Sequence, residues 1–96
     1  TTMSNRYYRN DRVAEGYHSG WKDSFGKKIP LTFHEIIDRR NGEIVAVFRN
    51  DGQLGGYGGI SPRIAATMQL RYLNGHLSPA AAAEWEKVVE NERAKP

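Results

Sequence analysis

Two short runs of β-branched and aromatic residues lie on either side of Asn41-Gly42, near the middle of the chain. Residues 31–40 set Leu, Phe and Ile among polar positions, and residues 43–48 are rich in Ile, Val and Phe. Asn-Gly between two such runs is a strong hairpin signal, because both residues tolerate the positive φ angles of a type I′ turn. The pattern predicts an antiparallel β-hairpin over 31–48.

A second turn signal, Asn50-Asp51-Gly52, follows the hairpin. We expect it to return residues 53–58 as a third strand at the edge of the sheet. The glycines between residues 55 and 59 weaken that strand, because a residue without a side chain adds little packing. The alternative is a glycine-rich loop beside a two-stranded sheet.

After the glycines the hydrophobic period changes from two to about 3.6, which is typical of helices. Ser61-Pro62 and Ser78-Pro79 each combine an N-cap residue with proline at the first helical position. Asn74-Gly75 is typical of a helix end. The first predicted helix has an apolar face of Ile64, Ala65, Met68 and Tyr72, and the second carries Trp85, Val88 and Val89.

The predicted fold is α+β, with an antiparallel hairpin or three-stranded meander packed against a C-terminal αα-hairpin. Residues 3–30 show no sustained period, so we expect an irregular aromatic and basic segment there, with a short helical turn at 12–17. A length of 96 residues corresponds to one small domain, 3–96. It divides into 3–30, the hairpin or meander with its glycine-rich loop at 31–59, and the helices at 61–93. We interpret Thr1 and Thr2 as an addition before a natural start at Met3.

The positive charge of the chain lies in its first half. Residues 1–50 contain nine Lys/Arg and six Asp/Glu, whereas residues 51–96 contain five of each, so the first half carries the whole net charge of +3. This asymmetry favours an anionic partner. The absence of cysteine excludes disulfides, thiolate zinc sites and a cysteine nucleophile, and suits a reducing cytoplasm. No apolar run reaches the roughly 18 residues of a membrane span.

Candidate catalytic chemistry centres on His34 and Asp38, which share one face of the first predicted strand because their spacing is even. With a cross-strand cation they would resemble a small ribonuclease-like phosphodiesterase site. The adjacent His34-Glu35 pair is a weaker candidate, since neighbouring strand residues point to opposite faces. The catalytic set is incomplete, so we expect no enzyme. The three histidines lie in separate segments, and the sequence predicts neither a metal site nor a cofactor.

The glycine-rich stretch ends at a predicted helix N-terminus, where backbone N–H groups favour anions. Gly58, Gly59 and Ser61 are therefore candidate anion-binding residues, although the lysine of a Walker motif is missing. A helix-turn-helix interpretation of the C-terminal helices fails because the would-be recognition helix is mainly acidic and would be repelled by phosphates.

The best candidate binding residues alternate cations with aromatics in the N-terminal segment. Aromatics and arginines are common hot spots of protein interfaces, and the same mixture suits single-stranded nucleic acid. Tyr57 joins them as the centre of a possible exposed edge. The candidate partner-binding residues are Arg6, Tyr7, Tyr8, Arg9, Arg12, Tyr17, Trp21, Lys22 and Tyr57.

We therefore expect a small non-catalytic binding module that occupies a macromolecular surface, such as a phage or mobile-element inhibitor of the anti-defence or anti-CRISPR type, or an adaptor. The expected partner is a protein, including one from a nucleic-acid-handling complex. Direct binding of nucleic acid by the basic N-terminal half is the alternative, and the ribonuclease-like site comes third. We expect a monomer or a homodimer, the dimer being favoured if Trp85 is exposed.

Overall fold

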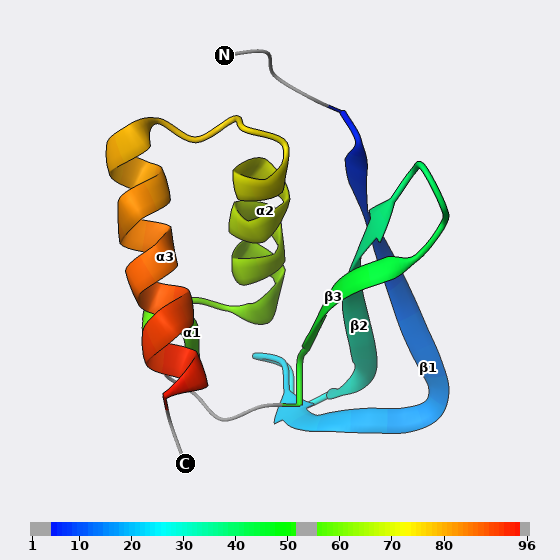
Figure 1. The fold of residues 1–96 in the computed structure, drawn as a ribbon. Coiled ribbons are helices and arrows are strands. Elements are labelled where there is room, and N and C mark those ends of the chain that lie inside the picture. Colours follow the sequence, from blue (N-terminus) through cyan, green and yellow to red (C-terminus); the bar gives the residue numbers. More distant parts are fainter. Residues whose placement is uncertain (1–4, 52–55, 95–96) are drawn as a thin grey trace.

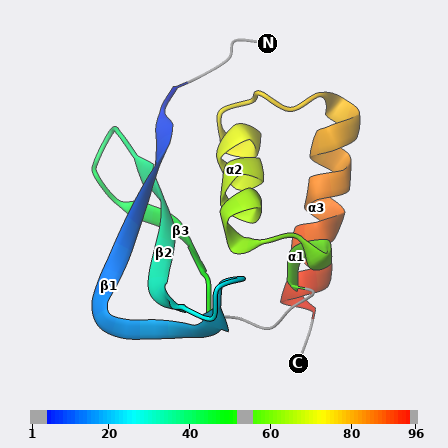
Figure 2. The ribbon, with the colours of Figure 1, turned by 180° about the vertical axis from the view of Figure 1, so that it is seen from behind.

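The computed structural model describes residues 5–51 and 56–94. These residues form the strands β1 (Tyr7–Lys22), β2 (Lys28–Asp38) and β3 (Ile44–Arg49) and the helices α1 (Gly56–Gly59), α2 (Pro62–Leu73) and α3 (Pro79–Arg93) (Figure 1). The strands form one antiparallel sheet in the order β1-β2-β3, and the helices lie to one side of it (Figure 2). The predicted α+β fold and C-terminal helical hairpin are confirmed.

The N-terminal segment is a long strand, so the prediction of an irregular lead-in with a helical turn at 12–17 is wrong. β1 also supplies the third strand of the sheet. Of the residues expected to do so, 53–55 lie outside the described residues and 56–58 belong to α1. β1 lacks the alternation of a half-buried strand because both of its faces carry polar side chains, whose partners lie on β2 and α2.

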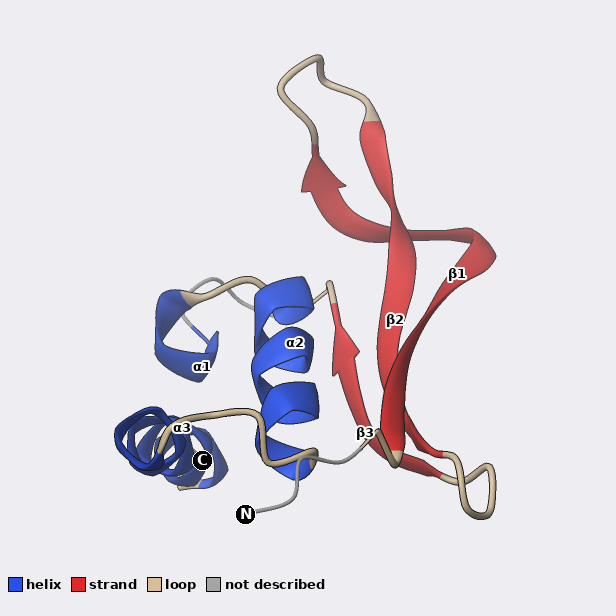
Figure 3. Ribbon diagram, turned by 90° about the horizontal axis from the view of Figure 1, so that it is seen from above, coloured by secondary structure: helices blue, strands red, loops and turns tan. Residues whose placement is uncertain are grey.

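β1 bends where its pairing with β2 changes register. Pairing is regular from Tyr7 opposite Asp38 to Val13 opposite Thr32, and it shifts before His18. Gly16 lies inside that shift with a φ of 83°, a backbone conformation that glycine adopts without strain. Beyond the bend, the distal end of the β1–β2 hairpin extends past the helices (Figure 3).

The hairpin predicted around Asn41-Gly42 is confirmed, but its turn is longer than a two-residue type I′ turn. β2 ends at Asp38 and β3 begins at Ile44. Gly42 has a positive φ of 72°, whereas Asn41 does not. The carboxylate of Asp38 explains the difference, because its Oδ1 accepts a hydrogen bond from the Arg40 amide at 3.0 Å and holds the chain in a wider loop.

Helices α2 and α3 begin and end at the predicted residues. The hydroxyl of Ser61 accepts a hydrogen bond from the Ile64 amide, and Ser78 does the same for Ala81. Asn74 is the C-cap of α2. The predicted apolar face needs one correction, since Ile64 is 48% exposed and Ala66, which was not predicted, is buried beside the predicted Ala65.

The core lies between the sheet and the helices, where Ile36, Phe48, Ala65, Ala66 and Trp85 pack together. The indole Nε1 of Trp85 donates a 2.7 Å hydrogen bond to Gln69, so its polar atom is satisfied inside the fold. Because Trp85 is only 3% exposed, the argument that an exposed Trp85 favours a dimer does not apply.

Candidate nucleic-acid interface

The candidate binding residues of β1 divide between the two faces of the sheet. Tyr7 packs against the core, and Arg9 donates a 2.7 Å hydrogen bond to Thr67 Oγ1 on α2. Both side chains therefore serve to dock β1 on α2. Tyr8 and Arg12 have even numbers and lie on the opposite face, because successive side chains of a strand alternate.

That opposite face consists of three rows of residues that pair directly across the strands, and we call it the open face. The row at one end is Arg12, Phe33 and Arg49, the middle row is Asn10, Glu35 and Val47, and the last row is Tyr8, Ile37 and Ile44. The described helices lie on the other side of the sheet. The open face thus has no second layer among the described residues.

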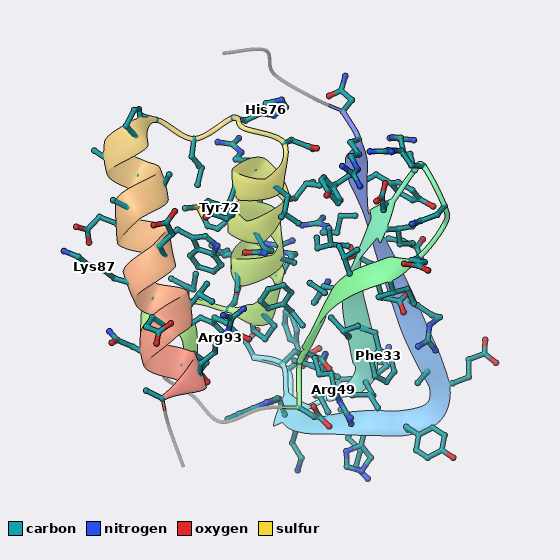
Figure 4. The ribbon with its side chains drawn as sticks, viewed as in Figure 1. Phe33, Arg49, Tyr72, His76, Lys87 and Arg93 are labelled. Carbon is teal, nitrogen blue, oxygen red and sulfur yellow. The ribbon has the colours of Figure 1, made fainter. Side chains whose placement is uncertain are left out.

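Three arginines lie against aromatic rings on the open face. The guanidinium carbons of Arg12 and Arg49 lie 4.5 and 5.2 Å from the ring centroid of Phe33, approaching from the two neighbouring strands. Figure 4 labels Phe33 and Arg49, which lie at the same end of the sheet. Arg39 lies 4.6 Å from the ring centroid of Tyr8. Such cation–π contacts orient the guanidinium groups without neutralising their charge.

Two carboxylates accompany these arginines. Arg12 Nε lies 3.5 Å from an oxygen of Glu35, which is only 4% exposed and also accepts a hydrogen bond from Asn10. Arg49 forms a 2.6 Å ion pair with Asp51, two residues further along the chain. The side chains of Arg12 and Arg49 nevertheless stay more than half exposed. Both cations are therefore held in place and accessible.

Arg6, the residue before β1, forms an ion pair with Asp38 at the end of β2. Its Nη2 and Nε atoms lie 2.8 and 3.1 Å from the carboxylate oxygens of Asp38. This hydrogen bond and the one from the Arg40 amide lower the pKa of Asp38 below its ordinary value of 3.8. Because Arg6 and Asp38 are tied together, Arg6 acts first as a structural residue.

Tyr17, Trp21 and Lys22 lie on the distal part of the β1–β2 hairpin, beyond the bend of β1. All three are exposed, and Tyr17 is 70% exposed. They belong to the same hairpin as the open face but lie outside its three rows.

Tyr57 lies in α1 and packs in a row of rings between Phe48 and Trp85, with centroid distances of 5.1 and 6.1 Å. Burial is the main cause that raises the pKa of Tyr57 above its ordinary value of 10.0. The expected exposed edge around Tyr57 is therefore wrong, since this residue completes the core. Its backbone N–H donates to Glu92 Oε2 at 3.0 Å.

The anion-binding role of Gly58, Gly59 and Ser61 stays a prediction. The Ser61 hydroxyl caps α2 by accepting from Ile64 N, and the amide next to Gly58 is occupied by a carboxylate. An anion at this place would meet the negative charge of Glu92.

His34 and Asp38 share a face, as expected, but each has a different partner. His34 Nδ1 lies 2.8 Å from Asp11 Oδ1, whereas Asp38 binds Arg6. Both side chains are buried on the face that α2 covers. Because the two side chains are buried and bind separate partners, the structure gives no support to the ribonuclease-like site.

Phe33, Arg39 and Arg49 are the residues of the open face that the sequence reasoning missed. Their signal was the hairpin itself, because its odd-numbered positions 33, 35 and 37 share one face. Arg12 joins Phe33 only through the register of β1, which was not recognised as a strand.

Within 5–51 and 56–94, no three His, Asp or Glu side chains gather where they could hold a metal ion. None of the helices in these ranges is long and apolar enough to cross a membrane. Comparisons of the chain with protein-family models, with curated proteins and with solved structures find no match.

Proposed function

We propose that this protein is a nucleic-acid-binding module that contacts phosphates through the open face. The observation that carries the proposal is the row Arg12–Phe33–Arg49, in which two exposed guanidinium groups lie against one ring. Arg39 against Tyr8 adds a third cation on the same face.

Arginine suits this task because its planar guanidinium presents several N–H donors to phosphate oxygens. An arginine held against a ring loses less side-chain freedom on binding than one that moves in solvent. Arg12 directs its Nε toward Glu35, and its terminal nitrogens have no hydrogen-bond partner among residues 5–51 and 56–94.

The carboxylates beside these arginines do not prevent the arginines from binding phosphate. Asp51 holds Arg49 through two hydrogen bonds, from Nε at 3.1 Å and from Nη2 at 2.6 Å, so a phosphate has to compete with this carboxylate for Arg49. The Arg49 side chain is more than half exposed, which leaves it accessible to that competitor. Glu35 is buried beneath Arg12 and would not meet an incoming phosphate.

Fluorescence anisotropy with labelled single-stranded and duplex DNA and RNA, at several salt concentrations, tests the proposal. We expect binding that weakens steeply with salt, because each phosphate contact releases counterions. Replacing both Arg12 and Arg49 by Ala should lower the slope of log K against log salt by about 2. The matched control is Arg71→Ala, which removes one exposed charge from α2, away from the open face.

Two results would contradict the proposal. One is the absence of binding to every nucleic acid at low salt. The other is equal loss of binding for Arg71→Ala and for either open-face single variant, because general charge would then explain the affinity. Circular dichroism of each variant shows whether the fold is retained.

A second candidate function, binding of a protein partner, is favoured by the edge of β3. In the described sheet β3 has β2 as its only neighbour, and Ile44, Val45 and Val47 are exposed. A groove of about 390 Å³ lies beside this edge, lined in part by Val45, Val47, Tyr57 and Val89. An extended segment of a partner would add to the sheet as a fourth strand.

Selection from a displayed peptide library tests the second candidate. We expect extended peptides with alternating apolar residues, and loss of their binding in Val45→Lys, because a lysine protects an edge strand from pairing. Peptides that bind Val45→Lys equally well would exclude this edge as the site.

A further inference from the structure

The tip of the β1–β2 hairpin is a hydrogen-bonded turn that presents one aromatic side chain to solvent. Asp23 holds it with four hydrogen bonds. Its carboxylate Oδ1 accepts from the amides of Phe25 and Lys27, both at 2.9 Å, and its backbone exchanges hydrogen bonds with Lys27 and Gly26 at 2.9 and 3.0 Å. Phe25 is 93% exposed at the apex of this turn.

Lysines surround the apex. Lys22, Lys27 and Lys28 are all exposed, and Lys22 lies directly opposite Lys28 where the two strands end. The one carboxylate of the turn, Asp23, is engaged by amide donors and helps to fix the loop. Because the hairpin extends past the helices (Figure 3), this basic tip can reach a partner before the body of the domain does.

We propose that the hairpin tip enters a groove of double-stranded nucleic acid and inserts Phe25 between two base pairs. This inference rests on the proposed nucleic-acid-binding function and names the form of nucleic acid that is bound. The lysines lie beside Phe25, where they contact the phosphates on either side of the two base pairs that Phe25 separates.

Dimensions and chemistry both support this placement. Two-stranded β-ribbons, whose strands lie about 4.8 Å apart, enter either groove of DNA, and the proteins that insert apolar wedges do so from the minor groove. Apolar wedges such as phenylalanine, accompanied by basic side chains, partly unstack base steps in proteins that kink DNA. Lysine is depleted at the centres of protein–protein interfaces, so a tip with three lysines suits phosphates better than a protein surface.

A duplex that carries 2-aminopurine reports the insertion, because the emission of this base rises when it is unstacked. We expect the full-length protein to raise the emission at least twofold at saturation. Phe25→Ser should abolish that rise and Phe25→Leu should retain most of it, since leucine is also an apolar wedge. Phe25 is nearly fully exposed, so neither variant should disturb the fold.

A second pair of measurements separates the contribution of the Phe25 ring to binding from the contribution of the lysine charges. Phe25→Ser should weaken duplex binding without changing the salt slope. Replacing Lys27 and Lys28 by Ala should lower that slope by about 2 while the 2-aminopurine signal persists at saturation.

The remaining outcomes overturn the inference in distinguishable ways. Salt-dependent duplex binding with unchanged emission, and with no effect of Phe25→Ser, rejects the wedge but keeps the proposed function. Tighter binding to single strands than to duplexes rejects the inference that the tip binds a duplex, and it keeps the proposed function. Absence of binding to any nucleic acid rejects both proposals. Phe25-dependent binding to phosphatidylserine vesicles in place of the duplex would show that the tip inserts into a lipid surface.

Discussion

The side-chain amide of Asn74 bonds the backbone of Tyr7 as a neighbouring strand would. Its Oδ1 accepts from Tyr7 N and its Nδ2 donates to Tyr7 O, both at 3.0 Å. Asn74 is also the C-cap of α2, so one residue ends a helix and satisfies an edge of the sheet.

Asn74→Ala should destabilise the protein by about 2 kcal/mol, because two hydrogen bonds are lost and two backbone groups of Tyr7 stay partly buried. Urea unfolding measures the change. Asn74→Asp keeps the acceptor but not the donor, so its stability should lie between those of Asn74→Ala and the unmodified protein. Equal stability of all three proteins would show that water replaces the amide without loss.

Asp38 should make stability depend on pH in the acid range. Its pKa is lowered in the folded state, first by the hydrogen bond from Arg6, so the folded protein binds this proton less readily than the unfolded chain. The stabilisation is present above about pH 3.8 and is lost as the pH falls through the lower folded-state value. Asp38→Asn should therefore be less stable than the unmodified protein at pH 7, and the difference should shrink below pH 4. A difference that is constant from pH 7 to pH 2 would contradict the role of the charge.

Tyr57 should make stability depend on pH in the alkaline range. Burial raises its pKa above 10.0, and the nearby Glu92 adds to the effect, so the folded state holds the phenolic proton more tightly. This contribution is complete below pH 10 and is lost as the pH rises through the folded-state pKa. Tyr57→Phe should lose less stability than the unmodified protein between pH 9 and pH 11.5. An equal loss of stability in Tyr57→Phe and in the unmodified protein over this range would contradict the role of the buried phenol.

Gly42 should be replaceable only at a conformational cost. Its φ is 72°, and a Cβ at this position would meet no atom within 4 Å, so no steric clash adds to the strain. Gly42→Ala should destabilise the protein by about 1 kcal/mol, and Gly42→Asn by less, because asparagine tolerates the left-handed region better. Thermal unfolding compares the two. A neutral Gly42→Ala variant would show that the loop changes its conformation.

The helices and the central hairpin could be predicted because their signals are local. Ser61-Pro62 and Ser78-Pro79 satisfy the first amides of each helix within three residues, and Gly42 turns the chain between two apolar runs. A short window of sequence contains the whole cause of each element.

β1 could not be predicted from its own hydrophobic pattern because, besides its pairing with β2, it is anchored by partners far along the chain. Arg9 bonds Thr67, Tyr7 bonds Asn74 and Arg6 bonds Asp38, so the strand is fixed by partners that no local pattern reveals. The open face was missed for the same reason. Its row Arg12–Phe33–Arg49 exists only once the register of all three strands is known.

The bonds between Tyr7 and Asn74 impose an order on folding during synthesis. The two residues are 67 positions apart, so at 5–20 residues per second Asn74 is made roughly 3 to 13 seconds after Tyr7. The β1–β2 hairpin can pair during that interval, but the outer edge of β1 at Tyr7 has no permanent partner until α2 is complete. A chain that stalls before residue 74 would therefore leave the Tyr7 end of this strand edge open to neighbouring chains.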